Sequence, residues 1–89
     1  MRVEVHPRIA SRHPEISAED VEAAWTGYAA AATRIPGERE MRVGFDARGR
    51  KIEMVGALMA DGTWLVYHAM TPPSEKTERE LRNAKRARR

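Results

Sequence analysis

The chain has 89 residues, no cysteine and a formal net charge of +3. This length predicts one domain over residues 1–89, and the lack of cysteine excludes disulfide bonds and thiolate metal sites. No apolar run approaches the roughly 20 residues of a membrane helix, and the first residues lack the apolar core of a signal peptide, so we expect a cytoplasmic protein with no membrane partner.

The first two predicted elements are short. Residues 2–5 alternate polar and apolar side chains, which is typical of a strand. His6 and Pro7 break this pattern, and Pro7 suits the first turn of a helix because its missing N–H would have no partner there. We therefore predict a short helix over residues 8–13, which Pro14 ends.

A capping box marks the start of the longest predicted helix. The Ser17 hydroxyl can accept the backbone N–H of Asp20, and Ile16 and Val21 occupy the positions of a hydrophobic staple. Apolar side chains then recur at helical spacing: Val21, Ala24, Trp25, Tyr28, Ala29 and Ala32. This stripe predicts one helix that continues to the break at residues 35–37 and buries Trp25 and Tyr28 in the core.

Three strand-like segments follow, over residues 41–46, 51–59 and 63–70, with turns between them. The middle segment is apolar on both faces from Met54 onward, so we expect it to be the central strand. The order of elements predicts an α+β fold. We expect a small antiparallel β-sheet of three to four strands with helices on one face and a basic C-terminal helix.

The final helix carries the excess positive charge. Ser74 is its predicted N-cap, and its acidic residues precede its basic ones, as the helix dipole favours. Residues 72–89 hold seven basic and three acidic side chains, whereas the other 71 residues hold nine and ten. A neutral body with a basic end indicates a polyanion or an acidic protein as partner. The alternative is a solvated helix that only maintains solubility.

The three histidines are the candidate chemical groups. The spacing of His6, His13 and His68 is not typical of a metal site, and we expect no metal or other cofactor. His68 lies near the end of one predicted strand, and Arg50 precedes the strand that should pair with it antiparallel, so we expect the two side chains to be neighbours. The alternative roles are a backbone hydrogen bond for His68 and helix-terminus compensation for His13.

The order of these motifs resembles the BrnT-like toxins of bacterial type II toxin–antitoxin systems, within the wider RelE-like ribonuclease group. The matching segments are His6-Pro7, Arg12-His13, residues 16–19, the hairpin at 44–50, His68-Ala69 and residues 78–80. The chain departs from the family pattern in three places. Pro14 follows the histidine where the family has glycine, Met70 stands where it has arginine, and the last helix lacks tyrosine.

The resemblance implies a toxin that cleaves RNA without a metal ion and forms a hetero-oligomer with a cognate antitoxin. His13 or His68 would transfer protons, and Arg50 would bind the phosphate. The basic residues implied to bind RNA are Arg12, Arg48, Lys76, Arg79, Arg82, Lys85 and Arg86. The competing hypothesis is a non-catalytic nucleic-acid- or protein-binding module, such as a degenerate toxin relative, which needs only the basic surface.

Overall fold

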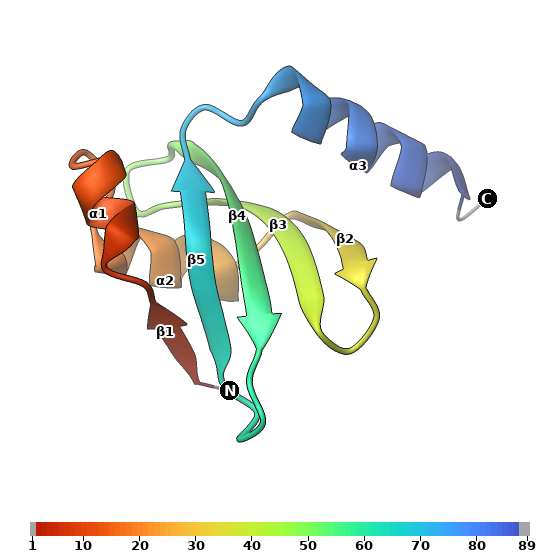
Figure 1. Cartoon of the computed structure of the whole chain (residues 1–89). Helices are drawn as coiled ribbons and strands as arrows, with labels where there is room; N and C mark the ends of the chain where they lie inside the picture. Colours follow the sequence, from red (N-terminus) through yellow and green to blue (C-terminus); the bar gives the residue numbers. More distant parts are fainter. Residues whose placement is uncertain (1, 88–89) are drawn as a thin grey trace.

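The computed structural model describes the backbone of residues 2–87 and the side chains of residues 2–85 (Figure 1). Its elements are β1 (Val3–Val5), α1 (Arg8–Arg12), α2 (Ala18–Thr26), β2 (Ala30–Ile35), β3 (Arg39–Phe45), β4 (Lys51–Leu58), β5 (Trp64–Met70) and α3 (Glu75–Ala87). None of the described helices is long and apolar enough to cross a membrane.

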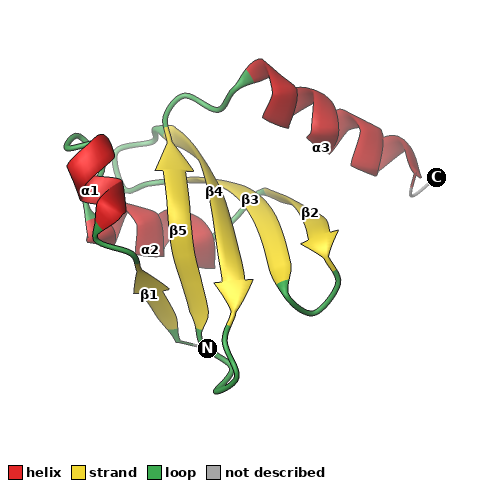
Figure 2. Cartoon of the chain, in the orientation of Figure 1, coloured by secondary structure: helices red, strands yellow, loops and turns green. Residues whose placement is uncertain are grey.

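The strands form one sheet in the order β1-β5-β4-β3-β2. The prediction of an α+β fold is confirmed, and so is the central strand, because β4 pairs antiparallel with both β3 and β5. The sheet is larger than predicted, with five strands, and it is mixed, because β1 pairs parallel with β5. Figure 2 shows these strands side by side, with β1 at one edge and β2 at the other.

The second helix is shorter than its apolar stripe predicted. Its capping box is present, because Ser17 and Asp20 exchange both hydrogen bonds. The helix ends at Thr26, however, and residues 30–35 form the edge strand β2 on β3. Gly27 disfavours helix continuation by about 1 kcal/mol relative to alanine, and pairing with β3 satisfies the following backbone instead.

Tyr28 is therefore not a core residue, contrary to the prediction. It follows the helix, is 45% exposed, and stacks its ring on the guanidinium group of Arg42 at 4.2 Å. Trp25, which lies within α2, is fully buried as expected. The apolar spacing that predicted one helix thus runs across two elements of the structure, α2 and β2.

Two apolar clusters lie on opposite faces of the sheet. The larger lies under α1 and α2 and contains Ile9, Ile16, Val21, Ala24, Trp25, Ile52, Met54, Val66 and Ala69. Close packing there needs glycine, because a Cβ on Gly44 would lie 2.0 Å from the carbonyl oxygen of Ala24. The smaller contains Ala32, Met41 and Val43, with Val55 and two α3 residues, Leu81 and Ala84, packed on it.

The expectation that all helices share one face is wrong. Met54 and Val55 are successive residues of β4, so their side chains point to opposite faces. Met54 belongs to the cluster under α2, whereas Val55 contacts the cluster under α3. Because β4 is apolar on both faces, both faces must be shielded from water. The helices α1 and α2 cover one face, and α3 covers the other.

Candidate active site

His68 lies at an irregularity in β5. Val55 of β4 pairs with His68, but the next residue, Gly56, pairs with Val66, so Tyr67 is an extra residue on β5. Such a bulge changes the direction of neighbouring side chains and is common near active sites. The His68 side chain is 39% exposed, and its Nε2 lies 2.8 Å from the Oε2 atom of Glu53.

Glu53 holds His68 from a buried position. Its side chain is only 8% exposed, and its Oε1 accepts the backbone N–H of Ser74 at 2.8 Å, just before α3 begins. Burial by itself would raise the pKa of Glu53, but hydrogen bonds from the Ser74 backbone and from His68 outweigh it and lower the pKa. An ionised Glu53 can only accept a hydrogen bond, so Nε2 of His68 is the donor, and in this tautomer of the neutral ring Nδ1 carries no proton.

His68 and His13 share a small pocket between α1 and β5. Its volume is about 120 Å³, and its polar lining comes from Arg8, Arg12, His13, Tyr67 and His68. The Arg8 Nε donates to the Tyr67 carbonyl oxygen at 3.0 Å, which fixes this arginine against the edge of β5. The structure therefore brings together two histidines and two arginines from elements that are far apart in the sequence.

His13 also has a carboxylate nearby. It follows α1, donates its backbone N–H to the Ile9 carbonyl oxygen at 2.8 Å, and has its Nδ1 3.7 Å from Glu15 Oε2. Its side chain is 35% exposed. The third histidine, His6, has a local role, since its Nδ1 accepts the backbone N–H of Arg8 at 3.1 Å.

Arg50 lies in a separate ion-pair cluster. Its Nε donates to the buried Asp46 carboxylate at 2.7 Å, and its Nη2 donates to Asp20 at 3.0 Å. Arg48, which is more exposed, also reaches Asp20, at 3.3 Å. The Ser17 backbone N–H, helped by both arginines, lowers the pKa of Asp20 despite partial burial. These arginines tie the β3–β4 hairpin to the start of α2.

The expected contact between His68 and Arg50 is wrong. β5 ends at Met70 opposite Glu53, so it stops before it reaches the level of Arg50. His68 pairs with Val55, and the five residues from Val55 back to Arg50 span about 17 Å along a strand. Arg50 also bonds to α2, on the face opposite α3. β4 and β5 do pair antiparallel as predicted, but their register leaves His68 and Arg50 far apart.

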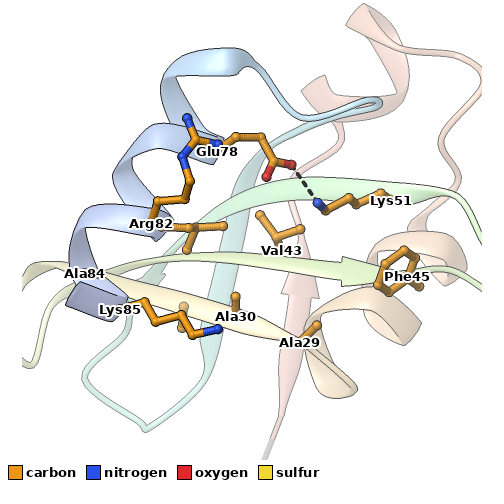
Figure 3. Close-up of a pocket in the computed structure, with 11 residues that line it drawn as sticks. Ala29, Ala30, Val43, Phe45, Lys51, Glu78, Arg82, Ala84 and Lys85 are labelled. Carbon is orange, nitrogen blue, oxygen red and sulfur yellow. Dashed lines mark ion pairs between the residues drawn. The ribbon is translucent and has the colours of Figure 1, made fainter. Parts of the chain in front are cut away.

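The other predicted RNA-binding residues do not converge on the histidine pocket. Lys76, Arg79, Arg82 and Lys85 lie along α3, and Arg79 is 3.9 Å from Glu75. Arg82 and Lys85 line a second, larger hollow beside β2 and β3 (Figure 3). The side chain of Arg86 lies outside the described residues.

Sequence reasoning missed Glu53 and Arg8. The available signal for Glu53 was a single carboxylate within the otherwise apolar segment 52–58, where an unpaired charge would be costly. No local pattern identified Arg8, because its role depends on the packing of α1 against β5. In the part of the chain whose side chains are described, no group of three or more His, Cys, Asp or Glu residues could hold a metal ion.

Comparisons with protein-family models, curated proteins and solved structures find no match for this chain.

Proposed function

We propose that this chain is a metal-independent endoribonuclease that acts as the toxin of a type II toxin–antitoxin system. The observation that carries the proposal is the pocket that His13 and His68 share with Arg8 and Arg12. A pair of histidines can supply both the base and the acid of RNA cleavage near neutral pH. The motif order that resembles BrnT-like toxins supports the same function.

In the proposed reaction, His68 is the general base. Its Nδ1 removes the proton of a ribose 2′-hydroxyl, and the 2′-oxygen attacks the adjacent phosphorus. The bond from phosphorus to the 5′-oxygen breaks, which leaves a 2′,3′-cyclic phosphate and a 5′-hydroxyl. Glu53 is a positioning residue, because its hydrogen bond keeps the proton on Nε2 and its charge stabilises the imidazolium that forms.

His13 and the two arginines complete the proposed chemistry. His13 protonates the departing 5′-oxygen, and the Oε2 atom of Glu15 lies 3.7 Å from Nδ1 of His13. Arg8 has guanidinium N–H groups beyond the one that bonds to Tyr67, and Arg12 is exposed beside the pocket. These donors would stabilise the charge on the phosphoryl oxygens. In this proposal Arg12 binds the RNA phosphate, as expected from the sequence. Arg8 takes the phosphate-binding role that was expected of Arg50.

The basic residues of α3 have a supporting role in this proposal. They would attract the RNA backbone without reading its sequence, and their contribution would fall as salt rises. A cognate antitoxin would block RNA access by binding the toxin.

The test is cleavage of a synthetic RNA oligonucleotide by the purified chain in the presence of EDTA. His68→Ala and His13→Ala should each reduce the rate about 100-fold or more, which is typical for loss of a general acid or base. Arg48→Ala is the matched control, because this arginine is exposed and does not line the pocket. Thermal melts should show that the variants stay folded.

Product analysis makes the test specific. The expected product carries a 2′,3′-cyclic phosphate, and a 2′-deoxy substitution at the cleaved position should stop the reaction. A wild-type chain that binds RNA but does not cleave it would reject the catalytic proposal and favour the non-catalytic binding module.

A further inference from the structure

A groove lies beside the contact of α3 with β2 and β3. Its volume is about 530 Å³, which is several times that of the histidine pocket. Figure 3 shows Ala29, Ala30 and Val43 below α3, with Phe45 toward one end and Lys85 toward the other. Two strands, β4 and β3, lie between β5, which carries the histidine pocket, and β2.

The floor of the groove is apolar. Residues 29–31 are all alanine, and their small side chains leave a depression beside Val43 and the α3 residues Leu81 and Ala84. Phe45 is 49% exposed, although a ring of this size is normally buried. Exposed apolar surface beside a hollow is typical of a protein-binding site.

The α3 side of the groove is positively charged. Arg82 and Lys85 both line it, and among the described residues no carboxylate lies within 4.0 Å of either. The third cation, Lys51, is already neutralised, because its Nζ lies 2.7 Å from Glu78 Oε1. The occupant should therefore combine apolar side chains with negative charge.

We infer that this groove binds an acidic amphipathic helix of a partner protein. The lining residues of α3 extend from Glu78 to Lys85, which is about 10 Å or two helical turns. A helix of similar length would place apolar side chains at i, i+3 or i+4, and i+7 on the floor, with carboxylates facing Arg82 and Lys85. The chain's own C-terminal residues cannot supply this charge, because they are basic.

RNA fits the groove less well than such a helix. Single-stranded RNA binds to surfaces that offer several aromatic rings and polar groups for the bases. Among the residues that the structure describes, Phe45 is the one aromatic side chain in this lining, and the floor is otherwise aliphatic. The inference does not depend on the proposed ribonuclease activity, because the groove and the histidine pocket use different residues.

The experiment selects binders from a displayed library of randomised 20-residue helical peptides, using the full chain as target. Enriched peptides are synthesised, and fluorescence anisotropy measures their affinity. We expect net negative peptides with the stated apolar spacing. The double variant Arg82→Glu, Lys85→Glu should weaken their binding about tenfold or more, and Phe45→Ser should also weaken it.

The matched control is the double variant Lys76→Glu, Arg79→Glu, which makes the same charge change on α3 outside the groove lining. It should leave peptide affinity nearly unchanged. Phe45→Ser should retain RNA cleavage, and His68→Ala should retain peptide binding, so the two proposals can fail separately.

Three results would overturn the inference. The first is a selection that yields no acidic peptide whose binding depends on the groove residues. The second is loss of RNA affinity, rather than peptide affinity, in Phe45→Ser, which would assign the groove to RNA. The third is a dimer in solution that Phe45→Ser dissociates, which would assign the groove to a second copy of the chain.

Discussion

The two faces of the sheet are covered very differently. The face under α1 and α2 is closely packed, with Trp25 fully buried and Gly44 in backbone contact with Ala24. The face under α3 has a smaller cluster and leaves Phe45 about half exposed beside an open groove. We expect the first face, with its larger buried cluster, to contribute most of the stability, whereas the second leaves surface available for binding. Variants that impair peptide binding should therefore be sought on the α3 face and variants that impair stability on the α2 face.

The first prediction tests whether the face under α1 and α2 contributes more to stability than the face under α3. Trp25→Ala should lower the free energy of unfolding by about 3–5 kcal/mol, as for other buried large aromatics. Leu81→Ala on α3 should cost much less, because Leu81 is only partly buried. Urea denaturation of both variants measures the difference. Equal losses of unfolding free energy would show that the two faces contribute equally to stability.

The second prediction concerns Glu53, because its carboxylate contacts both His68 and the backbone N–H of Ser74, just before α3. Glu53→Gln removes a buried charge that accepts two hydrogen bonds, so the free energy of unfolding at neutral pH should fall by about 1–3 kcal/mol. The folded-state pKa of Glu53 is lowered, so its stabilising contribution is present above the unfolded pKa of about 4.3. It is lost as pH falls through the folded-state pKa.

The deficit of Glu53→Gln should therefore shrink below about pH 4, which denaturation at several pH values can measure. A deficit that does not change with pH would mean that the charge of Glu53 is not what stabilises α3 and His68.

The last prediction concerns the two hairpin arginines, of which Arg48 should have the smaller effect. Arg50→Ala should cost about 1–3 kcal/mol, because Asp46 has no exposed side-chain surface and loses a charged partner. Arg48→Ala should cost under about 1 kcal/mol, because Arg48 is 64% exposed. Neither should change the RNA cleavage rate. A large loss of cleavage with unchanged stability in Arg50→Ala would restore the phosphate role that its sequence position suggested.

Features with a local cause could be predicted from the sequence. The capping box at Ser17, the cap at Ser74 and the three strands after residue 38 all follow from patterns a few residues long. The segment 29–32 could not be assigned in this way, because its four successive alanines favour a helix by local propensity and are uncommon in strands. Its pairing with β3 decides the outcome.

The candidate site depends on long-range geometry and was predicted only in part. Both histidines were identified as chemical groups, and the structure places them at one pocket. The partner of His68 was not identified, because the Glu53 contact follows the bulge at Tyr67 and the register of β4 with β5. Neither feature has a local sequence signal.

The parallel pairing of β1 with β5 has a consequence for folding. Val3 pairs with Trp64, so this contact closes a loop of roughly 60 residues, whereas β2 to β5 are joined by short connections. We expect the β2–β5 meander to form first and β1 to add afterwards, bringing α1 against β5. The histidine pocket would then be the last part to assemble, so folding intermediates should be inactive. Pulse-labelled hydrogen exchange can test this order, and early protection of the His6 amide, which donates to Val66, would contradict it.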